Sequence, residues 1–596
     1  MPRLLLLLTP LAMLVSLTGT AADNSYSPHA GENFPRQVYW GDTHVHSSWS
    51  VDAAVLGRTT LPPETASRFA RGEEVTATNG MRVKLRRPLD FLLLSDHAEY
   101  LGLMQQIHRS DPLLLASPQG KRWHAMFRGG PESSRKALFE ILTGLAQPDQ
   151  IDSPELRRSV WQQVTANADR FNQPGVFTAF IGYEWTSSLP NADNLHRNVI
   201  FRDGAEIADR ILPFSAQDST DPELLWQFLE QYERDTGGEV LAIPHNGNLS
   251  NGMMFASERL NGEPLDRDYV QLRARWEPVD EVPQIKGDGE AHPLVSPEDE
   301  FADYETWDTG NLGANPKPPG ALQYEYARSA LKLGLAHEAA LGTNPFQFGM
   351  IGSTDSHTGL ATGDENNFWG KFSKYEPGPE RFNPTVLPPG PDPELNIVGW
   401  QSAASGYAAV WATANTREAL FAALQRREVY ATTGPRITVR LFASFDFQPG
   451  DELAADHAAI GYRKGVPMGS GLSAAPAGKA PAFLIAAVRD PEGANLDRVQ
   501  IVKGWLDDKG ELQERIYNVA AGGRDISDNA VTPVGSTVDT GRATYSNSIG
   551  APQLVALWQD PNFDPGERAF YYARVLEIPT PRWTAFDTRF FGLEIA

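Results

Sequence analysis

Short apolar runs recur at long intervals along the first two thirds of the chain, and each run ends in a polar residue. Their length and composition are typical of buried strands. The runs are QVYWGD ending at Asp42, LDFLLLSD ending at Asp96, VFTAFIGYE ending at Glu184, EVLAIPH ending at His245 and FGMIGSTD ending at Asp355. Helical patterns such as LLWQFLEQYERDTGG separate them. The pattern predicts alternating strands and helices with a parallel sheet, whose polar groups lie at the carboxyl ends of the strands, where barrel enzymes place their chemistry.

Two insertions interrupt this alternation, and the pattern changes after Arg436. One insertion is helix-rich, from about residue 101 to 172, and the other is rich in Pro and Gly, from Phe372 to Glu394. Long insertions of this kind are often lids or substrate walls. Residues 437–596 read as alternating strands and turns, which predicts a β-sandwich-like C-terminal domain. Three tryptophans of this part are expected in its core rather than on a carbohydrate platform: Trp505, Trp558 and Trp583.

The 596-residue chain carries a formal net charge of -23, from 52 basic and 75 acidic residues. Nucleic acids and anionic membranes bind basic surfaces, so the charge argues against both as partners. Residues 1–22 have a basic start, an apolar stretch and small residues before a cleavage point, which predicts a signal peptide. With no cysteine, the chain has no disulfide or thiolate chemistry. We expect a periplasmic or secreted protein with no membrane span after signal cleavage and with domains at 23–436 and 437–596.

His44 and His46 lie two residues apart, directly after the first predicted strand. If the strand geometry continues, both imidazoles point to the same side and give one metal ion two nitrogen ligands. The pair alone is a weak signal, because 12 histidines in 596 residues produce such pairs by chance. Other strand ends add residues of ligand type: Asp96 and His97, Glu184, His245, and Asp355 with His357. Buried carboxylates and imidazoles in such numbers need cations to pair them, so the sequence predicts a metal cluster.

The order of these motifs resembles the polymerase and histidinol phosphatase (PHP) superfamily of metal-dependent phosphoesterases, in particular an uncharacterised secreted branch known by a domain-of-unknown-function label. The resemblance covers roughly residues 39–436, through H-x-H, a downstream Asp, S-D-H, a strand-end Glu, isolated His residues and D-x-H. It implies an α/β fold, a distorted PHP-like barrel of seven strand and helix units, with two or three divalent ions of Mn, Zn or Fe. The family usually has Ser-Asp-Gly after the first motif, whereas this chain has Ser50, Val51, Asp52 and Ala53.

The same resemblance implies nine ligands for these ions. The first ion would be held by His44, His46, Glu184 and Asp355. The second would be held by Asp52, His97 and His357. The third would be held by Glu184, as a bridge, with His196 and His245.

The catalytic residues expected beside the ions are Glu184, Asp355 and Arg197. Arg197 would neutralise charge that develops on the substrate. Because Arg197 follows His196 on a strand, it would face the opposite side, so a surface salt bridge is the other interpretation. Asp96 is expected to orient His97 or to cap the turn rather than to ligate.

The implied chemistry is hydrolysis of a small-molecule phosphoric ester by a hydroxide that bridges two ions. Hydrolysis of a sulfate ester and amidohydrolase-like cleavage of an amide or lactone are alternatives on the same cluster. A non-catalytic binding protein with a structural metal site is a third alternative. Structural sites tend to be closed and single, so nine candidate ligands disfavour it. The sequence gives no indication of the oligomeric state.

Overall fold

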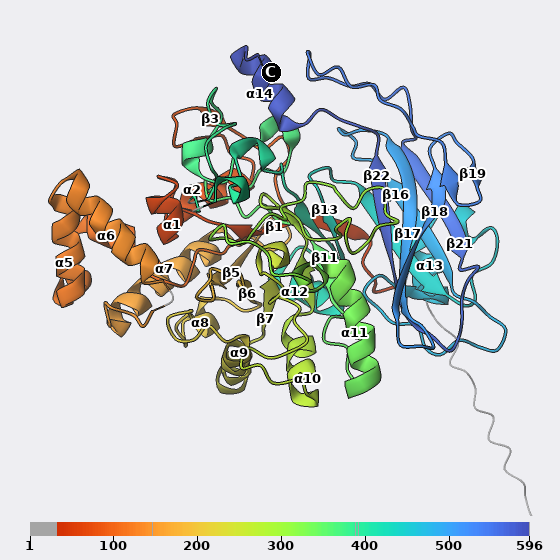
Figure 1. Cartoon of the computed structure of the whole chain (residues 1–596), viewed down its shortest axis with the longest axis horizontal. Helices are drawn as coiled ribbons and strands as arrows, with labels where there is room; N and C mark the ends of the chain where they lie inside the picture. Colours follow the sequence, from red (N-terminus) through yellow and green to blue (C-terminus); the bar gives the residue numbers. More distant parts are fainter. Residues whose placement is uncertain (1–31, 146, 388, 391, 595–596) are drawn as a thin grey trace, which may run out of the picture. The chain divides into compact units, whose positions relative to one another are not determined.

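A curled sheet of seven strands forms the centre of the N-terminal part of the protein, in the order β13-β12-β1-β4-β5-β6-β7 (Figure 1). The computed structural model describes residues 32–145, 147–387, 389–390 and 392–594, so the predicted signal peptide lies outside it. The strands are β1 (Gln37–Val45), β4 (Phe91–Leu94), β5 (Thr178–Trp185), β6 (Arg197–Phe201), β7 (Val240–Pro244), β12 (Tyr407–Ala412) and β13 (Val429–Thr432). With its helices this part is an α/β structure, as the alternation of runs predicted.

A short parallel ladder lies beside this sheet and is joined to its edge at β7 and to the end of β1. The ladder consists of β8 (Val279–Glu281) and β11 (Gly349–Ile351). Parallel bridges join His245 to Glu281 and Val45 to Ser356. The carboxyl ends of β1, β7, β8 and β11 therefore meet at one edge.

The prediction of a parallel sheet is wrong at four of the six pairs of neighbouring strands. β1, β4 and β5 are parallel, but β6 runs antiparallel to both β5 and β7, and β12 runs antiparallel to both β1 and β13. No helix lies between β5 and β6 in the chain, since the connection is the loop 186–196. A parallel pair needs a crossover, usually a helix, whereas a loop of this length returns the chain as an antiparallel neighbour. The direction of β6 matters for the site, because its amino end lies where its neighbours have their carboxyl ends.

Helices cover this sheet, and apolar side chains alternate along the strands between two cores. Leu92 belongs to one core together with α2 (Pro63–Ala70), α7 (Pro154–Phe171), α9 (Pro222–Thr236) and α10 (Arg267–Trp276). Phe91 and Leu93 belong to the other, which α12 (Arg417–Arg426) fills with Leu420 and Phe421. Period-two alternation of this kind places neighbouring residues of one strand on opposite faces. No described helix has the length and apolar character that crossing a bilayer requires.

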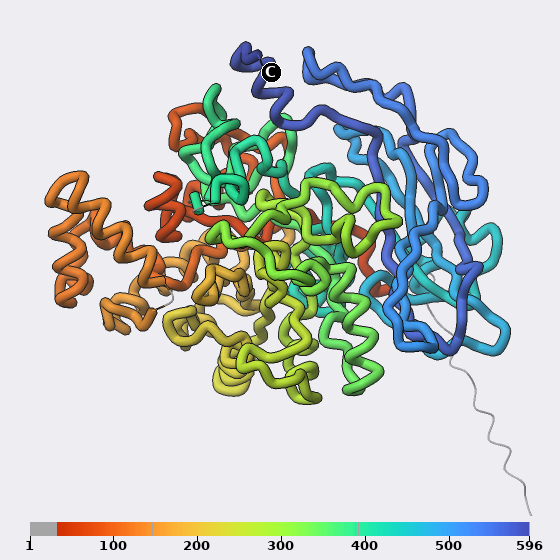
Figure 2. The backbone as a smooth tube through the Cα atoms, in the orientation of Figure 1, coloured from red at the N-terminus to blue at the C-terminus, as the bar shows by residue number. Residues whose placement is uncertain are grey.

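The helix-rich insertion forms its own core around Trp123 and Ile141 and extends from the sheet as a helical arm (Figure 2). Its helices before α7 are α3 (Leu103–Arg109), α4 (Pro112–Ala116), α5 (Pro118–Arg128) and α6 (Pro131–Thr143). The last three begin with proline, which lacks the N–H that the first turn of a helix leaves unpaired. The second insertion contains only short 3-10 turns among its described residues, such as Ser373–Tyr375 and Pro393–Leu395. Both insertions therefore have the character that their composition predicted.

Two antiparallel sheets follow the N-terminal part, and their side chains share one core. The first has the order β15-β14-β16-β21 and the second β18-β17-β22. Their strands are β14 (Thr438–Ser444), β15 (Val466–Pro467), β16 (Ala482–Val488), β17 (Leu496–Leu506), β18 (Leu512–Ala521), β21 (Gln553–Gln559) and β22 (Arg568–Glu577). Phe483 and Ile485 of the first sheet pack with Val499 and Ile501 of the second. The sequence pattern did not predict β18, because charged residues interrupt its alternation.

The C-terminal helix α14 (Trp583–Phe591) packs against the second insertion. Trp583 is buried, as expected, but its ring lies on Phe368 and Phe382, with centroids 4.9 and 5.4 Å away, rather than between the two C-terminal sheets. Arg381 pairs with Asp587 at 2.7 Å between Nη2 and Oδ1. The end of the chain therefore fastens a loop of the N-terminal part. Trp558 does pack on the shared core of the sheets, as a half-buried side chain.

A candidate metal cluster at the strand ends

All nine predicted ligands lie in one connected cluster, in which each is within ion-pair distance of at least one other. Seven of them lie on β1 or β5 or in the loops that follow β1, β4, β7 and β11. Asp52 lies in the first turn of the short helix α1 (Val51–Val55). His196 precedes β6, and only the antiparallel direction of that strand brings it to the same edge. Eight of the nine residues are buried, and Asp52, whose side chain is 18% exposed, is the most accessible.

Glu184 is the centre of the cluster and contacts histidines through both carboxylate oxygens. Its Oε1 lies 2.7 Å from His196 Nδ1 and 3.0 Å from His245 Nε2. Its Oε2 lies 3.0 Å from His97 Nδ1 and 3.1 Å from His46 Nε2. This is the position that a carboxylate shared between ions requires.

Four buried ligand atoms of the cluster face one another without forming a hydrogen bond among themselves: His44 Nε2, His46 Nε2, Glu184 Oε2 and Asp355 Oδ1. His44 Nε2 lies 3.6 Å from Glu184 Oε2 and 3.3 Å from Asp355 Oδ1. His46 Nε2 lies 3.1 and 3.5 Å from the same two atoms. Ligands about 2.1 Å from one tetrahedral ion are about 3.4 Å apart. The two nitrogens and two carboxylate oxygens therefore fit a divalent cation in chemistry and in spacing.

Asp52 connects a second group of predicted ligands. Its Oδ1 lies 3.1 Å from His97 Nε2 and its Oδ2 lies 2.9 Å from His357 Nε2. His46, His97 and His357 also bring one nitrogen each to within 4.8 Å of one another. His44 and His245 with one nitrogen each and Glu184 with one carboxylate oxygen form another set within the same distance. Buried groups in more than one place could therefore hold metal ions.

Asp355 has a left-handed backbone, with φ of 53°, which is uncommon for a residue other than glycine. Its backbone N–H donates to the carbonyl of His44 at 2.8 Å, and the N–H of His46 donates to Ser356 at 2.8 Å. These bonds hold the loop after β11 against β1. Left-handed residues of this kind persist where surrounding contacts fix them, as at functional sites.

Asp96 stabilises the turn after His46 and contacts none of the nine ligands through its carboxylate. It accepts hydrogen bonds from the backbone N–H groups of Ser47 and Ser50, at 2.7 and 3.1 Å, and from both hydroxyls, at 2.7 and 2.9 Å. The Ser50 hydroxyl lies 2.7 Å from His46 Nδ1. Asp96 thus has the turn-capping position that was expected of it.

Glu281 belongs to the site and was missed in the sequence. It ends β8, and its two oxygens lie 3.0 and 3.1 Å from His44 Nδ1. A carboxylate on the second nitrogen fixes the orientation of an imidazole ligand. Like the other cluster residues, Glu281 is a polar residue at the end of a strand. The run Val279–Glu281 is too short, however, to be distinguished as a strand in the sequence.

We expect Glu281→Gln to weaken the affinity of the protein for a divalent ion about 10- to 100-fold, because His44 loses its charged partner. Titration of the metal-free protein with Zn²⁺ or Mn²⁺ measures this change. Glu64→Gln, at a side chain that is 54% exposed on α2, is the control. Equal affinities in the two variants would contradict the assignment.

Lys286 and Lys371 were also missed, and both contact Asp355. Lys286 Nζ forms an ion pair with Oδ2, and Lys371 Nζ lies 2.6 Å from Oδ1. Both lysines are buried. Each lies in an irregular segment that no strand or helix pattern marks, so nothing in the sequence connected them with the cluster.

Arg197 lies outside the cluster, which does not support its predicted catalytic role. Its Nε lies 3.0 Å from Glu277 Oε1, and its ring neighbour is Trp185, 5.9 Å from the guanidinium. Alternation along β6 turns it away from the side that His196 occupies. The ion pair expected as the other interpretation is present, but it is buried rather than on the surface.

The charges of the cluster act strongly on one another. Burial opposes ionisation of Glu184, yet the neighbouring His97 and His196 imidazoles hold the pKa of its carboxyl well below its usual range. Burial also disfavours a charged His44, yet Glu281 and Asp355 raise the pKa of this imidazole to about 10. A histidine with so high a pKa lies in a field of negative charge, which is the environment that a cation stabilises.

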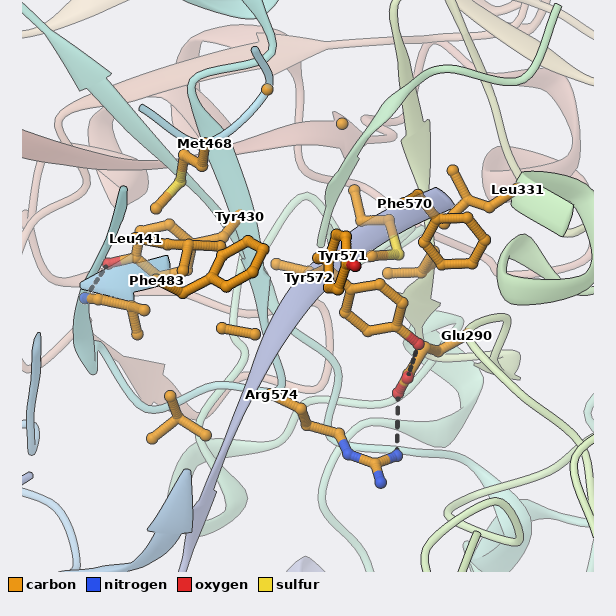
Figure 3. Close-up of a pocket in the computed structure, with 18 of the residues that line it drawn as sticks. Glu290, Leu331, Tyr430, Leu441, Met468, Phe483, Phe570, Tyr571, Tyr572 and Arg574 are labelled. Carbon is orange, nitrogen blue, oxygen red and sulfur yellow. Dashed lines mark hydrogen bonds and ion pairs between the residues drawn. The ribbon is translucent and has the colours of Figure 1, made fainter. Parts of the chain in front are cut away.

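A large cavity lies elsewhere, between the C-terminal sheets and the N-terminal part (Figure 3). Its volume is about 1310 Å³. Apolar side chains contribute much of its wall, among them Leu331, Tyr430, Leu441, Met468, Phe483 and Phe570. Arg574 in the wall pairs with Asp299 at 2.7 Å. None of the nine predicted ligands lines this cavity, so it is separate from the cluster.

Comparison with known proteins gives one match. A family model described as "Protein of unknown function (DUF3604)" matches residues 33–596. No curated protein and no solved structure matches the chain.

Proposed function

The chain belongs to the DUF3604 family, whose description assigns no activity, and we propose from the site itself that the protein is a metal-dependent hydrolase of phosphoric esters. The observation that carries the proposal is that four buried ligand atoms, on His44, His46, Glu184 and Asp355, face one another at 3.1 to 3.6 Å without a hydrogen bond among themselves. Two nitrogens and two carboxylate oxygens suit zinc, manganese and iron. We propose two or three such ions, with the remaining predicted ligands completing the cluster.

A divalent ion supplies two things to ester hydrolysis: it makes water more acidic and it neutralises charge on the ester oxygens. The protein side chains would hold and orient these ions. Glu184 and Asp355 would contribute carboxylate ligands, and Glu281, 3.0 Å from Nδ1 of His44, would fix the ring of that ligand. The side chain of Asp52, which is 18% exposed, marks the side from which a substrate reaches the cluster.

Sulfate esters are a second candidate substrate. Lys286 and Lys371 add two buried cations to the site, and ammonium groups bind sulfate as well as phosphate oxygens. Phosphate and sulfate esters both present a tetrahedral anion, and the two anions differ mainly in charge.

We propose that the strands of the N-terminal part form a distorted barrel like that of the PHP superfamily. Support comes from the bridges of Val45 to Ser356 and of His245 to Glu281, which join the β8-β11 ladder to both sides of the strands β1 to β7. We also propose that the two C-terminal sheets form a β-sandwich, because Phe483 and Ile501 from different sheets share a core. Export to the periplasm or the medium and the domain boundary after Arg436 stay predictions from the sequence.

The proposal is tested by purifying the protein, measuring its bound metals, and screening phosphate monoesters, phosphate diesters, sulfate esters and amides in parallel. We expect turnover of a phosphate ester that chelation abolishes and that Zn²⁺, Mn²⁺ or Fe²⁺ restores. Activity that survives complete removal of metal would rule out the proposed chemistry. Turnover of sulfate esters alone would select the second candidate.

A further inference from the structure

The two buried lysines of the cluster differ in how many of their N–H donors have an acceptor. Both ammonium groups contact the one carboxylate of Asp355. An ammonium has three donors and no acceptor. Asp355 is therefore the one side-chain carboxylate that both amino groups contact directly.

Lys371 is built into the scaffold of the predicted ligands. Its Nζ donates to the Asp355 carbonyl at 2.7 Å, lies 2.6 Å from the Asp355 carboxylate and 2.9 Å from His357 Nδ1. Its backbone carbonyl accepts from the His357 N–H at 2.8 Å. With these three polar neighbours, Lys371 fixes the positions of Asp355 and His357.

Lys286 has a different environment. Among the described residues its Nζ has one acceptor, Asp355 Oδ2, and its side chain is only 6% exposed. It lies in the turn between β9 (Pro283–Gln284) and β10 (Gly287–Asp288), where its backbone N–H donates to the Gln284 side chain at 3.0 Å. The turn thus holds the lysine in place, and its amino group also interacts with that of Lys371. Asp355 is its one carboxylate acceptor among the described residues, so a donor of the ammonium remains for an anionic ligand.

We propose that Lys286 binds an anionic oxygen of the substrate, a phosphate or sulfate ester, and that Lys371 is a positioning residue for Asp355 and His357. This inference rests on the proposed function, because the ester must lie beside ions held by the cluster. An ammonium and an ester oxyanion form a charge-assisted hydrogen bond, which recognises the tetrahedral anion rather than the leaving group.

The test compares wild-type protein with Lys286→Met, Lys371→Met and the control Lys464→Met, all loaded with the same divalent metal. Lys464 is also paired with an aspartate, Asp451, at 2.7 Å, but on α13 (His457–Lys464), outside the cluster. Bound metal is measured by mass spectrometry, and calorimetry gives the dissociation constants of inorganic phosphate and inorganic sulfate. The anion that binds wild-type protein more tightly distinguishes the two ester classes.

For Lys286→Met we expect unchanged metal content and anion binding weakened about 10- to 100-fold, with KM for the ester raised more than kcat is lowered. For Lys371→Met we expect loss of bound metal, and for Lys464→Met no change in either quantity. Lys286→Gln, which keeps a polar side chain in the same place, is measured in parallel in case the methionine variant does not fold.

A folded Lys286 variant that binds the anion as tightly as wild-type protein would overturn this inference but not the proposed function. Equal metal loss in the Lys286 and Lys371 variants would have the same consequence. Metal-loaded wild-type protein that binds neither anion would do the same. Wild-type protein that binds no metal would overturn the proposed function and this inference with it.

Discussion

Replacing Glu184 with glutamine is expected to remove bound metal and hydrolysis together. Its two oxygens contact four histidines at 2.7 to 3.1 Å. A neutral amide offers one oxygen and no charge, so the ions lose the one carboxylate that different parts of the cluster share. We expect turnover to fall by about 10³-fold or more, with a matching loss of metal, because residues that act as one unit fail together. Mass spectrometry of bound metal and an ester hydrolysis assay measure the two quantities.

Glu99→Gln is the matched control for this experiment. Glu99 is a fully buried glutamate at the same edge, but its Oε1 accepts from the backbone N–H groups of Thr186 and Ala216, at 3.3 and 2.6 Å. This variant should keep its metal. His44→Ala and Asp355→Ala should repeat the result of Glu184→Gln. A Glu184 variant that retained both metal and turnover would show that the central position is assigned wrongly.

The second large effect is on stability and concerns the ion pairs behind the site. Glu277 lies 3.0 Å from both Arg197 Nε and Arg273 Nε, and it accepts from Trp226 Nε1 at 2.9 Å. All three charged side chains are at most 3% exposed. Glu277→Ala leaves two buried guanidinium groups without an anion, so we expect it to lower the free energy of unfolding by about 3 to 5 kcal/mol. Denaturant unfolding followed by tryptophan fluorescence measures the change.

Glu73→Ala is the control, since it removes an exposed partner of Arg68 at 2.7 Å, and should cost less than about 1 kcal/mol. A similar loss of unfolding free energy in Glu277→Ala and Glu73→Ala would contradict the expectation that the buried ion pair is the costlier one to break. Arg197→Met separates stability from catalysis. It should weaken folding but leave the metal content of the folded protein unchanged, whereas loss of turnover alone would restore the catalytic role predicted for Arg197.

The sequence by itself determined the strands and most of the polar groups at their ends. β1, β4, β5, β7 and β11 each match a predicted apolar run, because a strand buried on both faces needs a continuous stretch of apolar residues. The residues after these runs are at one edge for a geometric reason, since parallel strands end on the same side of a sheet. The pattern of the chain is therefore enough to predict that His44, His97, Glu184, His245 and Asp355 lie together.

Tertiary structure decided what local patterns do not encode. His196 reaches the cluster only because β6 runs antiparallel to its neighbours, and strand direction depends on pairing between distant segments. Three further residues lie in segments too short or too irregular to show a hydrophobic periodicity: Glu281, Lys286 and Lys371. Tertiary packing alone brings them to His44 and Asp355. The sequence supplied the residues that suit a metal. The fold supplied the carboxylate of Glu281 that orients His44 and the two lysines that contact Asp355, because these contacts join residues 16 to 237 positions apart.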